Sequence, residues 1–191
     1  MGFLLEKCRF LTLDQTTIQN CHPFNCGNPD LDDFFLNDCH KYSQELLGKS
    51  YCFVLEDNPQ IIICAFTIAN YSIKVQLLPN NRKKRLVKNI PREKHMRSYP
   101  AVLIGRLGVN QDFNNKGVGS ELMNFIKVWF IDPKNKTGCR FIVVDAYNEE
   151  LPLRYYYKNG FEPVFSTESQ EAENLGIELK DNELLDTRLL S

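Results

Sequence analysis

The sequence predicts an α/β fold in which a central mixed sheet carries helices on both faces. Two observations lead to this prediction. In the first half of the chain, runs rich in β-branched and aromatic residues at Ser50–Glu56 and Ile61–Ile68 flank the turn sequence Asp57-Asn58-Pro59, which predicts an antiparallel hairpin. In the second half, apolar strands alternate with amphipathic helices, the order of elements that is typical of layered α/β domains.

The elements before the hairpin are a strand and a long helix. We expect the strand at Phe3–Thr12. Asn28 is a capping residue followed by Pro29 at the first helical position, and the helix is expected to end near Gly48. Apolar residues recur in it at spacings of three and four, which predicts one buried stripe that consists of Leu31, Phe34, Phe35, Cys39, Tyr42 and Leu46.

The elements after the hairpin alternate between strand and helix. Two apolar runs are nearly continuous, as expected of strands covered on both faces, and Asp132-Pro133 stops the helix between them. Gly160 suits the left-handed residue that closes the next helix. We therefore expect strands at Ala101–Val109, Cys139–Ala146 and Thr187–Leu190, and helices at Gly117–Ile131 and Pro152–Asn159.

Length and composition favour one folded domain. The chain has 191 residues, of which 43% are hydrophobic and 25% charged, as in an ordinary globular domain. We expect a single domain over residues 1–191, with a basic loop at 79–100 and an acidic insertion at 166–186. The formal net charge of −1 argues against a uniformly basic nucleic-acid binder, but it leaves room for two regions of opposite charge.

The cysteines indicate a reducing compartment. There are seven of them, an odd number, and several stand in apolar runs, which suits free thiols that pack as small apolar side chains. We therefore expect a cytoplasmic protein. The sequence has no apolar stretch of the ~18 residues that a membrane span needs, and its N-terminus lacks the pattern of a signal peptide, so we expect no membrane partner.

A metal site is the alternative use of the cysteines. The residues that could take part are Cys21, His22, Cys26, Cys39 and His40. The Cys-x4-Cys spacing is loose, and no second tight pair answers it, so a zinc cluster would have to be assembled irregularly. We expect no bound metal.

The segment after the strand at 101–109 carries the chemistry. A short polar loop follows Val109, and Lys116-Gly117-Val118-Gly119-Ser120 opens the next helix. Glycine lets a backbone approach a ligand closely, and the first turn of a helix offers N–H groups at the positive end of its dipole, so this is a candidate pyrophosphate cradle. The spacing fits neither a P-loop nor a dinucleotide fingerprint. Tight packing of the strand on the helix is the alternative explanation of the glycines.

Together with a second motif, this loop resembles the GNAT superfamily of acyl-CoA-dependent N-acyltransferases. Members carry an Arg/Gln-x-x-Gly-x-Gly/Ala loop, then a strand, then a helix with a tyrosine four residues before a Gly-Phe pair. Here the loop is 114–119, and the second motif is Tyr156 with Gly160-Phe161. The resemblance covers most of residues 50–165, implies a largely antiparallel mixed sheet, and departs from the family pattern at Asn114, where Arg or Gln is usual.

The resemblance also implies roles for the site residues. The cosubstrate would be acetyl-CoA or another acyl-CoA, and the acceptor a primary amine. The backbone at 107–109 would hold the pantetheine arm and polarise the thioester carbonyl, while Tyr156 would protonate the leaving thiolate. The implied cofactor-binding residues are Leu107, Gly108, Val109, Asn114, Asn115, Lys116, Gly117, Val118, Gly119, Ser120 and Asn148.

Two roles stay open at this point. Tyr156 also lies at core-facing helical spacing with Leu153 and Tyr157, so packing is its alternative role. No residue stands out as general base, because Asp145 and the glutamates that follow it fit a solvated rim or a helix cap. A water chain or an already neutral amine would serve instead.

A closer resemblance concerns the acceptor. Residues 24–35, 50–54 and 99–107 look like the subgroup that contains acetyltransferase toxins of toxin–antitoxin pairs, which acetylate aminoacyl-tRNA and are neutralised by a ribbon-helix-helix antitoxin. Residues 79–100 hold eight basic residues against one glutamate. The subgroup uses such positive surface to hold tRNA, and a solvated loop is the alternative. The implied nucleic-acid-binding residues are Arg82, Lys83, Lys84, Arg85, Arg92 and Arg97.

Three functions are therefore weighed. The first is an acetyl-CoA-dependent N-acetyltransferase for a primary amine, and the second is a toxin that acetylates aminoacyl-tRNA. The acidic segment at 166–186, with seven acidic residues and one lysine, departs from the toxin subgroup, because it would cover the basic loop or repel RNA. The third is a non-catalytic module that binds CoA or a partner. A homodimer is implied by the resemblance alone.

Overall fold

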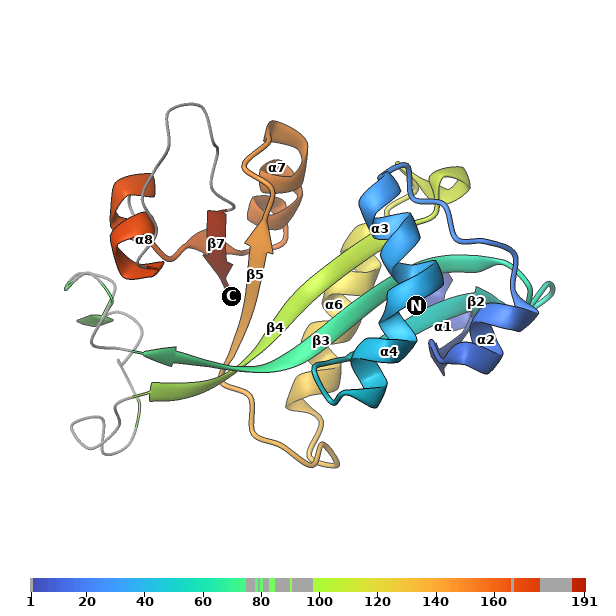
Figure 1. The fold of residues 1–191 in the computed structure, drawn as a ribbon, viewed down its shortest axis with the longest axis horizontal. Coiled ribbons are helices and arrows are strands. Elements are labelled where there is room, and N and C mark those ends of the chain that lie inside the picture. The colour runs from blue at the N-terminus through green and yellow to red at the C-terminus, as the bar shows by residue number, and fades with distance from the viewer. Residues whose placement is uncertain are drawn as a thin grey trace. The chain divides into compact units, whose positions relative to one another are not determined.

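The computed structural model describes residues 2–74, 78, 80, 83–84, 90, 98–165, 167–175 and 187–191. Their strands form a seven-stranded, mostly antiparallel sheet in the order β1-β2-β3-β4-β5-β7-β6, which confirms the predicted α/β fold (Figure 1). The strands are β1 (Cys8–Thr12), β2 (Lys49–Leu55), β3 (Ile62–Lys74), β4 (Ser98–Val109), β5 (Phe141–Ala146), β6 (Glu162–Pro163) and β7 (Thr187–Leu190).

The chain divides into two compact units, which are described in turn. The first unit comprises Met1–Ala69 and Ile104–Asn135, and the second comprises Asn70–Leu103 and Lys136–Ser191. The helices are α1 (Phe3–Lys7), α2 (Gln15–Asn20), α3 (Pro29–Asp33), the π-helix η1 (Phe34–Asp38), α4 (Cys39–Gln44), the 3-10 helix η4 (Gln111–Phe113), α6 (Val118–Ile131), α7 (Glu150–Lys158) and α8 (Glu168–Leu175).

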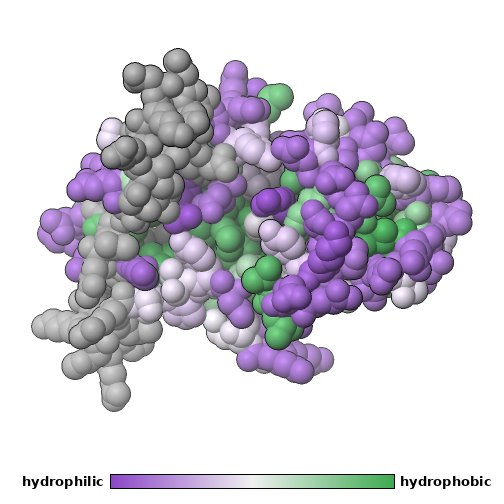
Figure 2. Space-filling model, in the orientation of Figure 1, coloured by the Kyte–Doolittle hydropathy of each residue, from purple (hydrophilic) through white to green (hydrophobic). Residues whose placement is uncertain are grey.

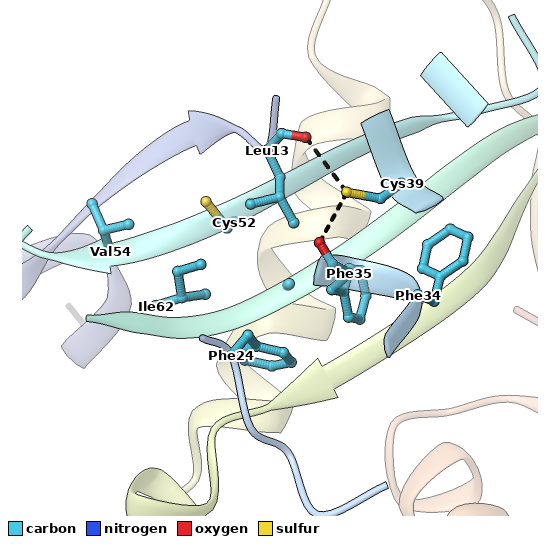
Figure 3. Packing of buried hydrophobic residues seen from close by; sticks show 9 residues of the cluster. Leu13, Phe24, Phe34, Phe35, Cys39, Cys52, Val54 and Ile62 are labelled. Atoms are coloured by element: carbon cyan, nitrogen blue, oxygen red, sulfur yellow. Dashed lines mark hydrogen bonds between the residues drawn. The ribbon is translucent and has the colours of Figure 1, made fainter. Parts of the chain in front are cut away.

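The predicted hairpin gives the first unit two packed faces. Side chains alternate along β2, so Tyr51 and Phe53 lie on the face of α6, where their rings contact Trp129 and Phe125 at centroid distances of 4.9 Å each. The neighbouring Cys52 and Val54 lie on the opposite face, which α3, η1 and α4 cover (Figure 1). The core on that face consists of Leu13, Phe24, Phe34, Phe35, Cys39, Cys52, Val54, Ile62 and Ala65 (Figure 3).

The strand predicted at Phe3–Thr12 is confirmed only in its second half. Phe3–Lys7 is helix α1, and only Cys8–Thr12 is strand β1. The first turn of α1 is held by α6, because Glu121 Oε2 accepts a hydrogen bond from Leu4 N at 2.9 Å. Leu4 is buried. Glu121 is far from residues 3–7 in the sequence, so the strand propensity of those residues could not predict this contact.

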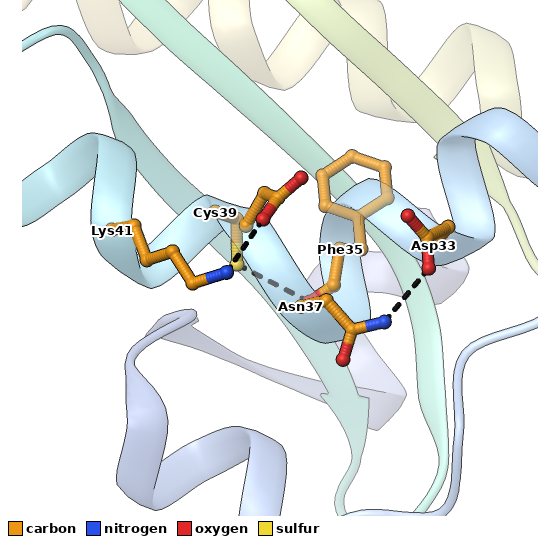
Figure 4. Close-up of polar contacts among 6 residues, drawn as sticks. Asp33, Phe35, Asn37, Cys39 and Lys41 are labelled. Atoms are coloured by element: carbon orange, nitrogen blue, oxygen red, sulfur yellow. Dashed lines mark hydrogen bonds and ion pairs between the residues drawn. The ribbon is translucent and has the colours of Figure 1, made fainter.

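The helix predicted from Asn28 to Gly48 starts as expected and then changes its geometry. The Asn28 side chain accepts hydrogen bonds from the backbone of Asp30 and Leu31, at 3.0 and 3.2 Å, and Pro29 takes the first position. From Phe34 the chain forms a π-helix, with Cys39 N donating to Phe34 O, and α4 ends at Gln44. Figure 4 shows side-chain bonds that brace this region: Asn37 to Asp33 at 2.7 Å and Lys41 to Asp38 at 2.9 Å.

The π-helix corrects the predicted buried stripe. A π-turn holds one extra residue, which rotates the following positions by about 100° relative to a straight α-helix. Tyr42, predicted to face the core, is therefore 41% exposed. Leu46, also predicted to face the core, is 86% exposed because α4 ends at Gln44, before it. Leu46 and Leu47, which follow α4, are both exposed. The face drawn in Figure 2 is mostly hydrophilic, with hydrophobic residues between the hydrophilic ones.

The second unit is built around β5. Its core contains Tyr99, Phe141, Val143 and Phe165, and β5 pairs with β7 in an antiparallel register that sets Asp145 opposite Arg188. The predicted strands at 139–146 and 187–190 and the helix at 152–159 are confirmed within two residues. Gly160 has a φ of 78°, as predicted for the helix end.

Several short elements were not predicted. They are α2 and η4 in the first unit, and β6 and α8 in the second. Helix α8 lies in the segment expected as an acidic insertion, and its Glu171 and Ala172 are buried, so this part is packed rather than a surface loop. Among the described residues, no helix has the length and apolar character required to cross a membrane.

Leu46 occupies a left-handed conformation, with a φ of 58°, at the end of α4. A glycine has no Cβ to crowd this conformation, so we expect Leu46→Gly to stabilise the protein by about 0.5–1 kcal/mol. Denaturant unfolding followed by the fluorescence of the single tryptophan, Trp129, measures this. Leu46→Ala removes the same exposed side chain but keeps the Cβ, and it is expected to give no gain. Equal stabilisation by both variants would contradict the explanation.

Candidate active site

The loop after β4 is anchored to β3 in the first unit. Asn110 follows the last residue of β4, and its backbone N donates to Ile63 O at 2.9 Å while its side-chain Nδ2 donates to Ile62 O at 2.9 Å. Its Oδ1 accepts from Asp112 N at 3.1 Å, which starts η4. One side chain thus fixes the strand end and the first turn of the loop.

The loop reaches α6 through two left-handed residues. Asn115 has a φ of 60° and Gly117, which caps α6, has a φ of 83°. A Cβ at Gly117 would meet no atom within 4 Å, so the backbone conformation rather than crowding requires a glycine there. The chain turns sharply into the first turn of α6, with Glu121 N bonded to Gly117 O. The backbone N–H groups of this first turn lie at the positive end of the α6 dipole.

The predicted cradle residues are partly exposed. Residues 114–117 are exposed, Gly119 and Ser120 are intermediate, and Val118 is buried. The side chain of Val118 is therefore out of reach of a ligand, and this residue could offer only its backbone. Lys116 Nζ donates to Asp112 O at 2.8 Å and lies 5.2 Å from the centre of the Phe113 ring, which keeps a positive charge beside the loop.

Gly108 on β4 has a packing reason of its own. A Cβ there would lie 3.1 Å from the Cβ and Sγ of Cys26 and from the Phe24 ring. The segment carrying Cys26 is held by Asp32, whose Oδ1 accepts from Cys26 N at 2.7 Å. Close approach between β4 and this segment therefore explains the glycine without a ligand. Leu107 and Val109 on either side are partly exposed.

Tyr156 lies in the second unit, on α7. Its ring centroid is 5.5 Å from that of Phe161, and its carbonyl accepts from Phe161 N at 3.1 Å. The Gly-Phe pair therefore packs against Tyr156, which gives the predicted motif a structural basis. Burial raises the pKa of Tyr156 to about 12, so the hydroxyl is protonated at neutral pH. Tyr157, the next residue of α7, is 46% exposed.

The strand end before α7 holds the other predicted residue. Asn148 is partly buried in the turn between β5 and α7, where Glu149 N donates to Tyr147 O at 2.8 Å. Glu149 occupies the N-cap position, but its side chain makes no cap bond. Asp145 is exposed, in keeping with a rim residue, and both of its carboxylate oxygens accept hydrogen bonds from Arg188.

The comparison with protein families decides the classification. The model of the acetyltransferase (GNAT) domain matches residues 48–163, well over half of the chain. This chain belongs to the GNAT acetyltransferase family. The match spans both the loop that opens α6 and the tyrosine of α7.

Several solved structures share this fold. A tyrosine-to-phenylalanine mutant of KacT has a TM-score of 0.65 at 18% identity, with 96% of this chain and 94% of that chain covered. AtaT complexed with acetyl-methionyl-tRNAfMet has a TM-score of 0.63 at 17% identity, with the same coverage. The KacTA-DNA complex has a TM-score of 0.62 at 16% identity, with 97% and 92% covered. At these identities the likeness is one of fold.

Burial favours the protonated form of the thiols in the described part of this GNAT chain. Burial raises the pKa of Cys26 and Cys39 to about 11. Cys39 Sγ donates to Phe35 O at 3.2 Å, and Cys21 Sγ donates to Pro59 O at 3.5 Å. Within the described ranges, no group of three or more His, Cys, Asp or Glu side chains is placed to hold a metal ion.

Most of the predicted nucleic-acid-binding residues lie outside the described residues. These are Arg82, Arg85, Arg92 and Arg97. Lys83 and Lys84 are described, and both are exposed in a helical turn.

Sequence reasoning missed one polar group of the second unit. Arg188 Nε and Nη2 donate to the two carboxylate oxygens of Asp145, at 2.8 and 3.1 Å, and Arg188 N donates to Glu171 Oε1 at 2.8 Å. The only signal was the presence of opposite charges in two predicted strands. Their register, which brings them together, could not be read from the sequence.

The close approach at Gly108 can be tested by adding a methyl group. Gly108→Ala places a Cβ 3.1 Å from Cys26 and Phe24, so we expect a loss of about 1–3 kcal/mol in the free energy of unfolding. Gly105, on the same strand, has no atom within 4 Å of its Cβ position, so Gly105→Ala is the matched control and should cause no loss. Denaturant unfolding followed by Trp129 fluorescence compares the two. Similar losses in both would show that strand propensity, not packing, is responsible.

Proposed function

We propose that this protein transfers an acetyl group from acetyl-CoA to a primary amine, with Tyr156 as general acid. The observation that supports this most directly is a protonated tyrosine packed by Phe161 in a chain of the GNAT family. The glycine-capped start of α6 suits the pyrophosphate of the cosubstrate, through the backbone of residues 117–120. The partly exposed backbone of Leu107 and Val109 suits the pantetheine arm.

The proposed reaction balances without another reactant. The neutral amine attacks the thioester carbon, a C–N bond forms, and the C–S bond breaks. The leaving sulfur takes a proton from the Tyr156 hydroxyl, and the amine loses its proton to solvent. A pKa of about 12 makes the hydroxyl a weak acid, so it contributes mainly as a hydrogen-bond donor while negative charge grows on the sulfur. The same pKa ensures that the phenolate is reprotonated from water before the next turnover.

Removing the hydroxyl tests the role of Tyr156. Tyr156→Phe keeps the ring contact with Phe161, so the fold should persist while kcat falls on the order of 10²-fold. The KM for acetyl-CoA should stay within about threefold, because the hydroxyl is proposed to act on the leaving sulfur and not in binding the cosubstrate. Steady-state kinetics with excess amine measure both. Tyr157→Phe, at an exposed position, is the control, and a Tyr156→Phe enzyme within twofold of wild type would rule out the assignment.

The pH dependence gives a separate test of the same residue. Because the pKa of Tyr156 is raised to about 12, the acid stays protonated as the pH rises, and only the acceptor amine titrates. We expect kcat/KM to rise with pH and to show no descending limb up to about pH 10. A descending limb that Tyr156→Phe abolishes would mean that the acid in use has a lower pKa.

Aminoacyl-tRNA is the second candidate acceptor. Supporting it are the fold likeness to AtaT, solved as a complex with acetyl-methionyl-tRNAfMet, and the eight basic residues at 79–100. By the same likeness the partner would be an antitoxin, since an AtaT mutant toxin is solved bound to the C-terminus of AtaR.

A panel of acceptors separates the candidates. Labelled acetyl-CoA is offered with polyamines, peptides and charged tRNA, and the products are identified by mass spectrometry. Acetylated aminoacyl-tRNA, with growth arrest on expression that Tyr156→Phe relieves, is the result expected of a toxin. Product with free amines only, and normal growth, would remove the toxin candidate. Binding of acetyl-CoA without turnover of any acceptor would favour the non-catalytic module.

A further inference from the structure

In the first unit, the segment that connects α2 to α3 meets the loop after β4 (Figure 1). Asn25 makes this connection with its side chain and with its backbone. Its Oδ1 accepts a hydrogen bond from Gln111 Nε2 at 2.9 Å, and its carbonyl oxygen accepts one from Gln111 N at 3.0 Å. Two bonds between the same two residues, which lie 86 positions apart in the sequence, fix both the position and the direction of the loop where it leaves β4.

The Asn25 side chain is itself held in place by a tight turn. Its Oδ1 also accepts from Gly27 N at 3.1 Å, so one oxygen receives two donors. Gly27 has a φ of 87°, and a Cβ there would lie only 2.8 Å from Gln111 Nε2. The glycine therefore leaves the space through which the Gln111 amide reaches Asn25. Cys26 N donates to Asp32 Oδ1 at 2.7 Å, which joins the turn to α3.

Gln111 is the first residue of η4, from which the loop continues to the start of α6. Its carbonyl oxygen accepts from Asn114 N at 3.1 Å. Lys116 Nζ donates to Asp112 O at 2.8 Å, which joins the end of the loop back to η4. A series of hydrogen bonds thus runs from Asn25 through η4 to Lys116, directly before the glycine that caps α6.

This loop has little buried surface of its own to hold it. Gln111, Asp112 and residues 114–117 are exposed, and Phe113 is partly exposed. A segment with few buried contacts opens locally at a low free-energy cost. Ordering such a loop when a ligand binds costs affinity, so hydrogen bonds that order it beforehand favour binding.

We propose that Asn25 is a positioning residue for acetyl-CoA. Through Gln111 it holds residues 111–117 in the conformation that presents the backbone N–H groups of the α6 start to the pyrophosphate. The proposal rests on the proposed function, because it takes this loop as the cradle of that cosubstrate. Asn25 acts through Gln111 and not by touching the reacting atoms. Its effect is therefore on the binding of acetyl-CoA and not on the chemical step.

Two single variants and their double variant test the connection. Asn25→Ala removes the oxygen that receives two donors and should raise the Kd for acetyl-CoA about fivefold to tenfold. Gln111→Met keeps the length of the side chain but has no N–H to donate, and it should raise the Kd about threefold or more. Both changes break the same bond, so the double variant should bind about as weakly as Asn25→Ala alone. The control is Asn37→Ala, which removes an exposed side-chain bond to Asp33 and should leave the Kd unchanged.

The experiment measures binding, loop order and turnover separately. Calorimetric titration with acetyl-CoA gives the Kd, and amide hydrogen exchange without ligand follows the loop directly. We expect residues 111–117 to exchange faster in Asn25→Ala, while the denaturant midpoint stays close to that of wild type because Asn25 and Gln111 are exposed. Steady-state kinetics with the amine that the acceptor panel identifies should show a raised KM for acetyl-CoA and a kcat within about twofold of wild type.

The outcomes separate this role from the proposed function. If wild type binds acetyl-CoA and Asn25→Ala binds it equally well, the positioning role is overturned and the proposed function stands. Effects that multiply in the double variant would also overturn the role, because the two residues would then act independently. An equal loss of affinity in Asn37→Ala would indicate general loosening of the unit and would overturn it as well. If wild type binds no acetyl-CoA, the proposed function is rejected, and the role of Asn25 with it.

Discussion

Strand register is the constraint on which both units depend. Along β2 the side chains alternate, so that Tyr51 and Phe53 meet α6 while Cys52 and Val54 meet the helices of the other face. A slip of one residue against β3 would exchange these two sets. Buried aromatic rings would then face the space filled by Cys52, and small side chains would face Trp129. The antiparallel pairing of Ser50 with Thr67, whose hydroxyls lie 2.6 Å apart, is one buried contact that holds this register.

In the second unit, strand register also brings two oppositely charged side chains together. Asp145 and Arg188 face each other because β5 and β7 pair in one alignment. The same alignment places the Arg188 backbone beside Glu171 of α8. A carboxylate alone at the end of β5 would be a candidate general base. Here both of its oxygens accept hydrogen bonds from Arg188, so the carboxylate is part of an ion pair instead.

Much of the fold was predictable because its signals are local. The turn at Asp57-Asn58-Pro59, the cap at Asn28 and the left-handed Gly160 each depend on neighbouring residues only. One error arose where a distant residue decides: Glu121 holds the first turn of α1, so that the strand begins only at Cys8. The other arose inside the helix, where a π-turn shifts Tyr42 out of the predicted buried stripe. Of the candidate site, the loop at Gly117 and the Tyr156 motif were visible in sequence. The ion pair of Asp145 with Arg188 was not, because only the register of β5 against β7 brings the two side chains together.

The protonated thiols make the folded chain slow to react with electrophiles. Burial raises the pKa of Cys8 to about 11 and that of Cys52 to about 12, so a fraction of only about 10⁻⁴ or less of either thiol is ionised at pH 7. A thiol that reacts quickly with an alkylating agent must then belong to a chain segment that has opened to water. Alkylation rates, read cysteine by cysteine, would thus map local opening across β1, β2 and α4 without any engineered probe.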